Sequence, residues 1–129
     1  MRVTICLTAA LVVCAASTPA LAKTAKPAAF QLNETTWTFV DKGVKVRESI
    51  DASGNYIENA VNGKHIDHGA AVMKGQKACF TSAMTKEGEV CWTTLPHALK
   101  IGHSFVTTND KGEKLKVTRV AYAQQKMPK

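Results

Sequence analysis

The chain has 129 residues, 45% of them hydrophobic, and a formal net charge of +7 at pH 7. A chain of this length and hydrophobic content forms one domain with a core, which excludes a multidomain architecture. Its Lys and Arg residues are not clustered with aromatic residues as on nucleic-acid-binding surfaces, so we expect no nucleic-acid partner.

Residues 1–22 have the organisation of a signal peptide. Arg2 supplies a positive charge, an apolar run follows as far as Ala16, and Ala20-Leu21-Ala22 matches the A-x-A pattern of a cleavage site. The run is shorter than the roughly 20 residues of a transmembrane helix, and no second one follows it. We therefore expect cleavage after Ala22, export to the periplasm or the medium of a bacterial cell, and no transmembrane segment in the mature chain.

Lipidation is an alternative route for the same segment. Leu11-Val12-Val13-Cys14 resembles a lipidation box, in which Cys14 would carry the anchor. Such boxes have a small residue directly before the cysteine, and Val13 departs from that pattern. Cleavage after Ala22 is therefore the favoured interpretation.

Residues 23–33 are predicted to be a flexible lead-in and residues 124–129 a disordered tail. Between them, residues 34–123 show short β-rich stretches separated by glycine-containing turns. Regular turn signals of this kind are typical of an all-β barrel or sandwich. We expect one domain, an eight-stranded antiparallel meander that forms a small barrel or an open sandwich. Its strands are predicted at residues 35–40, 44–51, 56–61, 65–73, 77–82, 89–93, 99–108 and 113–122.

Two kinds of tight turn are predicted from the glycine positions. Asn62-Gly63 matches a two-residue type I′ hairpin, in which both residues have positive φ. Asp41-Lys42-Gly43 and Asp110-Lys111-Gly112 match three-residue loops with the glycine in the left-handed conformation.

Alternation of apolar and polar residues assigns one face of each strand to the interior, because successive side chains point to opposite sides of a sheet. An eight-stranded barrel has an interior that side chains fill or that holds one small ligand. The apolar residues placed on the inner face are Trp37, Phe39, Val44, Val46, Ile50, Ile66, Ala70, Val72, Ala78, Phe80, Val90, Trp92, Ile101, Phe105, Leu115 and Val117.

The mature chain keeps two cysteines, Cys79 and Cys91. Phe80 and Trp92 follow them directly, so if both aromatic side chains point inward, both cysteines point outward on neighbouring strands. Directly opposite residues on antiparallel strands have nearly the Cβ spacing that a disulfide needs. We therefore predict a structural disulfide that closes a hairpin in an oxidising compartment.

The same phasing places four polar residues on the inner face, namely Glu48, His68, His103 and Arg119. Together with Trp37 they are the candidate ligand-binding residues of a cavity, with Glu48 and Arg119 as candidates for an ion pair. A second interpretation makes Glu48, His68 and His103 a two-histidine, one-carboxylate metal site. A third is structural: bulges shift the phase, or the groups lie at the barrel ends in contact with water. We expect no metal and no cofactor.

Trp37 in the first predicted strand and Arg119 in the last, within one eight-stranded meander, resemble the calycin superfamily of lipocalin-like barrels. There, a first-strand tryptophan packs under a last-strand arginine, so the resemblance implies a barrel spanning these two residues. The mature chain is also similar in size to small bacterial periplasmic barrels, among them metalloprotease inhibitors that act through their N-terminal strand. Lys77-Ala78-Cys79-Phe80 and Cys91-Trp92-Thr93 resemble segments of uncharacterised small exported proteins of Gram-negative bacteria.

Two functions are consistent with these patterns. The first is a binding module, a periplasmic barrel that holds a small apolar or amphipathic molecule. The second is protein interaction, as a protease inhibitor or an envelope structural protein, with Pro27-Ala28-Ala29-Phe30 as the insertion segment. No Ser-His-Asp or Cys-His set follows from the spacing, so an enzyme is not expected. The expected partner is an unknown small molecule or an envelope protein, and the expected state is a monomer.

Overall fold

The computed structural model describes residues 16–21 and 25–129. Most of the expected signal peptide lies outside this range, as do Cys14 and the bond after Ala22 at which cleavage is predicted. No helix in the described part of the chain has the length and apolar character needed to cross a bilayer.

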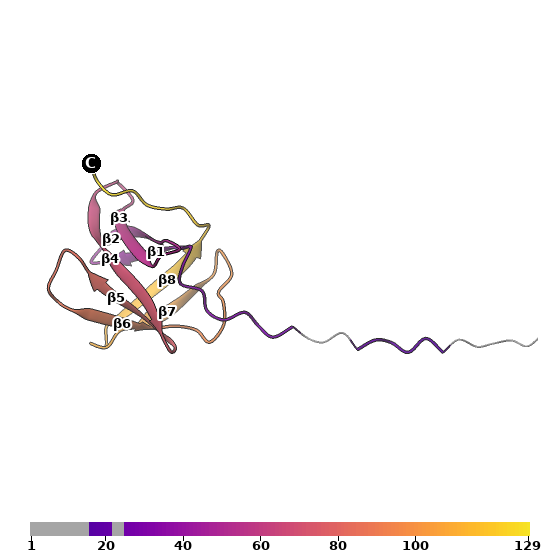
Figure 1. Cartoon of the computed structure of the whole chain (residues 1–129). Helices are drawn as coiled ribbons and strands as arrows, with labels where there is room; N and C mark the ends of the chain where they lie inside the picture. Colours follow the sequence, from indigo (N-terminus) through magenta and orange to yellow (C-terminus); the bar gives the residue numbers. More distant parts are fainter. Residues whose placement is uncertain (1–15, 22–24) are drawn as a thin grey trace, which may run out of the picture.

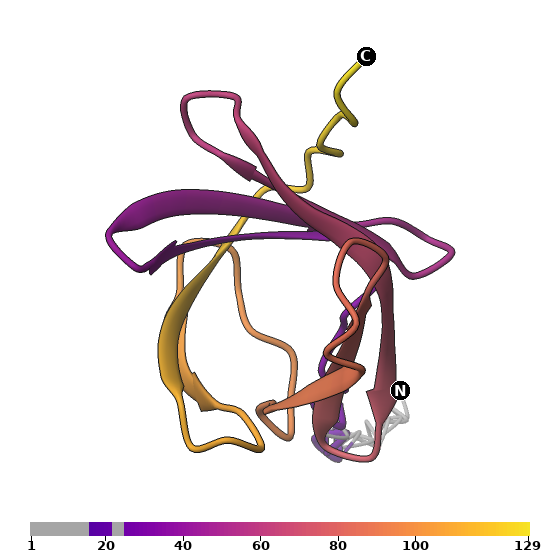
Figure 2. The same ribbon diagram turned by 90° about the vertical axis from the view of Figure 1, so that its left-hand side faces the viewer.

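Eight antiparallel strands form one sheet within the described residues, which confirms the predicted all-β fold. The strands are β1 (Thr35–Asp41), β2 (Val44–Ile50), β3 (Asn55–Ala60), β4 (His65–Lys74), β5 (Lys77–Ser82), β6 (Glu89–Thr93), β7 (Ser104–Thr108) and β8 (Lys114–Val120). Their order across the sheet is β6-β5-β4-β3-β2-β1-β8-β7. The sheet curls round until β7 approaches β6, which produces a nearly closed barrel (Figures 1 and 2).

The barrel closes along the β6–β7 seam, where the described residues form no regular ladder. A single isolated bridge joins Trp92 to Asn109. Side chains supply further contacts: the Thr107 hydroxyl donates to the Thr93 carbonyl at 2.7 Å, and the Thr108 amide donates to Thr93 Oγ1 at 3.1 Å. Because ladder hydrogen bonds are nearly absent, side-chain contacts hold this edge of the barrel together.

The predicted strand at 99–108 is shorter than expected, because β7 begins at Ser104 and residues 99–103 lie outside any strand, with a turn at residues 101–102. The inward assignment of Ile101 is therefore wrong, and its side chain is 60% exposed. The inward assignment of Val44 is also wrong. Val44 is the first residue of β2, directly after the β1–β2 turn at the end of the barrel, and is 45% exposed.

A bulge interrupts the pairing of β3 with β4. Glu58 lies opposite Asp67, but the next pair is Asn59 with His65, so Ile66 has no partner across the ladder. One extra residue in a strand reverses the alternation of its side chains relative to the neighbouring strand. The bulge therefore decides which β4 side chains point into the barrel.

The inward assignment of Ala70, Val72 and His68 is wrong for this reason, since all three fall on the outer side of β4. Ala71 is 6% exposed and belongs to the core, whereas Ala70 is exposed and Val72 is 49% exposed. Both faces of β4 carry apolar residues, so hydrophobicity alone does not distinguish them.

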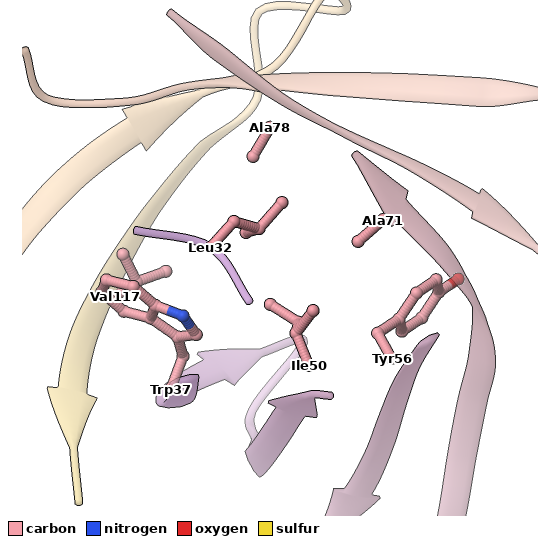
Figure 3. Packing of buried hydrophobic residues seen from close by; sticks show 7 residues of the cluster. All are labelled: Leu32, Trp37, Ile50, Tyr56, Ala71, Ala78 and Val117. Atoms are coloured by element: carbon pink, nitrogen blue, oxygen red, sulfur yellow. The ribbon is translucent and has the colours of Figure 1, made fainter. Parts of the chain in front are cut away.

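The buried core lies inside the barrel and includes part of the lead-in. Leu32, from the segment before β1, is 5% exposed, and the ring of Phe30 stacks on that of Trp37 with centroids 5.7 Å apart. Residues 30–32 thus close one end of the barrel. Side chains of the core point toward one another across the interior (Figure 3). This cluster comprises Leu32, Trp37, Ile50, Tyr56, Ala71, Ala78 and Val117.

Two turns differ from their predicted types. At the β1–β2 connection Asp41 pairs with Val44, and both intervening residues have positive φ, 47° at Lys42 and 78° at Gly43. This is the two-residue pattern that had been predicted for residues 62–63. There, the Gly63 amide donates to the Ala60 carbonyl at 2.8 Å, and only the glycine has positive φ.

The predicted disulfide is confirmed. Cys79 and Cys91 lie directly opposite each other on β5 and β6 and are bonded. They are 12 residues apart in the chain, so the bond closes a loose hairpin rather than a tight one.

Residues 121–126 run over the outer face of the barrel (Figure 1). The Ala123 amide donates to the Thr36 hydroxyl at 2.8 Å, and the Gln125 amide donates to the Ser49 hydroxyl at 2.8 Å. Ser49 is 1% exposed beneath this segment. Gln125, within the predicted tail, is therefore anchored to β2.

Candidate ligand cavity

A cavity of about 570 Å³ occupies the barrel interior. Small-molecule sites measure roughly 300–1,000 Å³. The lining reaches from Phe30 and Leu32 at one end to the turn residues Lys42, Gly88 and Lys111 at the other. Since neighbouring strands are antiparallel, the β1–β2, β5–β6 and β7–β8 connections share one end of the barrel. The lead-in therefore closes one end of the cavity, and these three connections surround the other.

Aromatic rings form much of the cavity wall. Near the closed end the ring of Phe105 meets those of Phe30 and Trp37 edge to face, with centroids 6.0 and 6.1 Å apart. On the other side of the interior the rings of Tyr56 and Phe80 are edge to face at 5.3 Å. Such pairs favour fixed ring orientations, so the wall offers rigid apolar surface and ring faces to a ligand.

Three carboxylates on neighbouring strands line the same wall, and we call them the carboxylate row. Glu48 of β2 lies directly opposite Glu58 of β3, which lies opposite Asp67 of β4. Opposite residues point to the same side of a sheet, and all three line the cavity. Glu48 is only 6% exposed.

Burial is the main cause of unusual proton affinity in this row. It raises the pKa of Glu48 well above its ordinary value, and the nearby charge of Glu58 raises that pKa further. Burial also raises the pKa of Glu58. Two carboxyl groups in such contact favour the state in which one carries a proton and hydrogen-bonds to the other.

Asp67 has three hydrogen-bond donors of its own. The Tyr56 hydroxyl donates to its Oδ2 at 2.8 Å, the Ser82 hydroxyl to its Oδ1 at 2.6 Å, and the His68 amide to its Oδ1 at 2.8 Å. Burial followed by the hydrogen bond to Asp67 raises the pKa of Tyr56, which keeps the phenol protonated as a donor. Both oxygen atoms of the Asp67 carboxylate thus accept hydrogen bonds from the protein itself.

Glu48 and Glu58 have no comparable support. Neither has an ion-pair partner among the described residues, where both ion pairs join exposed surface groups. The side-chain hydrogen bond that influences the pKa of each glutamate is the one that they make with each other. The pair therefore presents oxygen atoms to the cavity without a cation to balance their charge.

The structure brings two of the five predicted ligand-binding residues to the cavity, Trp37 and Glu48. Arg119 lies directly opposite Trp37 on β8, at the closed end of the barrel. Its Nη1 donates to the Leu99 carbonyl at 2.7 Å, and no ion pair joins it to Glu48. The buried glutamate is accompanied by another carboxylate instead of by the expected arginine.

The structure places His68 and His103 away from the cavity lining. The bulge puts His68 on the outer face of β4, where its Nδ1 lies 3.1 Å from Nε2 of His65. His103 is exposed in the β6–β7 connection. The arrangement does not bring these histidines together with Glu48 as the metal-site interpretation requires.

Cys79, Glu89 and Cys91 are the one group of three metal-ligating residue types that cluster closely in the described part of the chain. Both sulfur atoms are bonded to each other, so neither is a thiolate. Metal ligation by cysteine requires the thiolate, which this bond removes.

Sequence reasoning missed Glu58, Asp67 and Tyr56 as cavity residues. Tyr56 and Glu58 alternate within one strand, as side chains on one face do, which was an available signal. Asp67 faces inward only because of the bulge in β4. Its position therefore could not be found from alternation.

The chain was compared with protein-family models, curated proteins and solved structures, and none of these matched it. The class of the protein is therefore defined by its fold and its cavity. Its described residues form an all-β, nearly closed barrel with the Cys79–Cys91 disulfide and an interior cavity whose lining includes aromatic and acidic side chains.

Proposed function

We propose that the protein is an exported barrel that binds one small amphipathic molecule in its interior. The observation that carries the proposal is the cavity of about 570 Å³, whose lining combines apolar and aromatic residues with polar and charged ones. In binding sites for small molecules apolar surface supplies affinity and polar groups fix orientation, and an amphipathic molecule would use both parts of this lining. The proposed role is binding rather than catalysis, as expected from the sequence.

The proposed location is the periplasm or the medium of a bacterial cell. Its support is the predicted signal peptide together with the disulfide, because disulfides persist in oxidising compartments. The resemblance to lipocalin-like barrels stays a prediction, and the proposal does not depend on it.

The protein-interaction hypothesis has less support. Its insertion segment contains Phe30, whose ring stacks on Trp37 inside the protein's own barrel. The Ala28 carbonyl also accepts a hydrogen bond from the Ala98 amide at 2.8 Å. Insertion into a partner would therefore have to break contacts that close the barrel.

A pair of matched substitutions tests the binding proposal. Ala78 is 5% exposed and lines the cavity, whereas Ala70 lies on the outside of β4. The variant A78F is expected to fill the cavity and abolish binding of a fluorescent apolar dye, while A70F retains it. Circular dichroism checks that both variants keep the strand signal of the wild type.

Equal dye binding by wild type, A78F and A70F would overturn the proposal, because the dye would then bind elsewhere. A wild-type protein that binds no dye, and that carries no added mass in native mass spectrometry after purification from the periplasm, would also overturn it.

A further inference from the structure

The cavity carries negative charge inside a protein of positive net charge. The chain has a formal net charge of +7, yet Glu48 and Glu58 face the interior without a cation. Glu48 is 6% exposed, so bulk water does little to compensate its charge. Removing a carboxylate from water without a partner is costly; the proton that Glu48 shares with Glu58 offsets part of this cost, and a bound cation would offset it in the same way.

The lysines of the cavity lining do not provide that compensation. Lys42, Lys111 and Lys114 belong to the turns or their edges at the open end, and all three are exposed. None of them forms an ion pair with a carboxylate of the row. The rim carries charges of both signs, since Asp41, Glu87 and Glu113 lie there with the three lysines, whereas the charged groups within the barrel are the carboxylates of the row.

Aromatic rings surround Glu48 and Glu58. Tyr56 lies two positions before Glu58 on the same face of β3, and Phe80 packs against the ring of Tyr56. Trp37 lies directly opposite Glu48 on β1. Ring faces attract cations, and they do so more strongly where water is excluded. Carboxylates and ring faces together suit an organic cation better than a neutral or anionic group.

We propose that the cavity takes a hydrophobic organic cation, an ammonium or guanidinium group carrying an apolar tail, whose charge lies beside Glu48 and Glu58. The apolar tail packs against the rings of Phe30, Trp37 and Phe105 at the closed end. This assignment rests on the proposed function, because it names the chemical class of the molecule held in the barrel.

Binding of a cation replaces the proton that Glu48 and Glu58 share, and that proton passes to solvent. Affinity for the cation is therefore expected to rise with pH. The charge of Asp67 on β4 raises the pKa of both glutamates, and that of Asp41 on β1 raises the pKa of Glu58. Both groups are carboxylates, so their charge also attracts a cation.

Three probes with the same alkyl chain test the proposal: decyltrimethylammonium, decanol and decanoate, each below its micelle concentration. Binding to the wild-type protein is measured by calorimetry and by emission of the chain's two tryptophans, both of which line the cavity. The ammonium probe is expected to bind at least about tenfold more tightly than the alcohol at neutral pH, as charge-assisted contacts do. Decanoate is expected to bind most weakly.

Matched variants locate the selectivity. Glu48→Gln and Glu58→Gln are each expected to remove most of the preference for the ammonium probe while leaving decanol affinity within about threefold. Glu87→Gln is the control, because Glu87 lines the open end and is exposed. It is expected to keep the preference.

The outcomes separate this inference from the proposed function. If none of the three probes binds, the binding function itself fails. If decanol or decanoate binds as tightly as the ammonium probe, the barrel is a binding protein but the cationic class is wrong. If Glu87→Gln loses the preference as fully as Glu48→Gln does, the charge does not lie beside the buried pair and the inference is overturned. The wild-type comparison stands even where a variant does not fold.

Discussion

Removal of the Cys79–Cys91 bond is expected to lower the free energy of unfolding substantially. The two residues lie opposite each other on β5 and β6, and β6 meets its other neighbour, β7, through a single bridge. The disulfide therefore attaches β6 covalently to β5, while the other edge of β6 has few backbone hydrogen bonds. The double variant C79A/C91A removes the bond without leaving a free thiol.

The magnitude follows from the length of the closed loop. The two cysteines are 12 residues apart, and closing a loop of that length in the unfolded chain corresponds to about 3 kcal/mol at 25 °C in the chain-entropy model. For a domain of this size, such a loss lowers the thermal midpoint by more than about 10 °C. It is a large part of a typical stability of about 5–15 kcal/mol.

Urea unfolding of the oxidised wild type and of C79A/C91A measures the difference. Reductant added to the wild type is expected to bring its unfolding curve to that of the variant, and reductant added to the variant is expected to change nothing. If wild type and variant unfold at the same urea concentration with equal slopes, the loop-closure reasoning is refuted.

Three further predictions concern the barrel interior. Leu32→Ala is expected to lower the free energy of unfolding by about 2–5 kcal/mol in urea titration, because Leu32 is 5% exposed in the core. The pKa of Glu48 is raised from its ordinary 4.5, so its stabilising contribution is complete below that pH and is lost as pH rises through the raised value. Thermal melts between pH 4 and 9 are expected to show that Glu48→Gln loses less stability than wild type over this rise; equal losses would contradict it. Gly69→Ala is expected to cost about 3 kcal/mol or more, since a Cβ there would lie 2.0 Å from the Thr81 carbonyl oxygen and 2.9 Å from the Tyr56 ring; a cost below about 1 kcal/mol in urea would contradict that.

Several features of the fold were predictable because they depend on short stretches of chain. Trp37 and Ile50 alternate with polar residues in their strands, Ala78 is in phase with Phe80, and Trp37, Ile50 and Ala78 are all core residues. The pairing of Cys79 with Cys91 followed from their phase relative to the neighbouring aromatic residues. Alternation is a local property, so it can be recognised from the strand's own residues wherever no bulge interrupts the strand.

The facing of β4 was not predictable in the same way. Ile66 is left unpaired because Asn59 pairs with His65 on one side of it while Glu58 pairs with Asp67 on the other. Whether a strand takes such a bulge depends on contacts with both of its neighbours, which lie far away in the sequence. Because of this bulge, the predicted inward position of His68 was wrong and the inward position of Asp67 was missed.

The candidate site shows the same division. Glu48 was singled out because a carboxylate interrupts the apolar alternation of its strand, which is visible in the sequence. Its partner Glu58 becomes visible only from the β2–β3 register, and Arg119, the partner first suggested, hydrogen-bonds to Leu99 instead.

By itself, the sequence determined that the described chain forms eight strands, where most of them turn, and which cysteines bond, because period-two patterns and turn residues act over a few positions. The tertiary structure decided the register between strands, the closure of the sheet and the use of the lead-in as a plug. These depend on the summed contacts of segments far apart in the chain. That is why the cavity and the pairing of Glu48 with Glu58 emerged only once the strands were placed side by side.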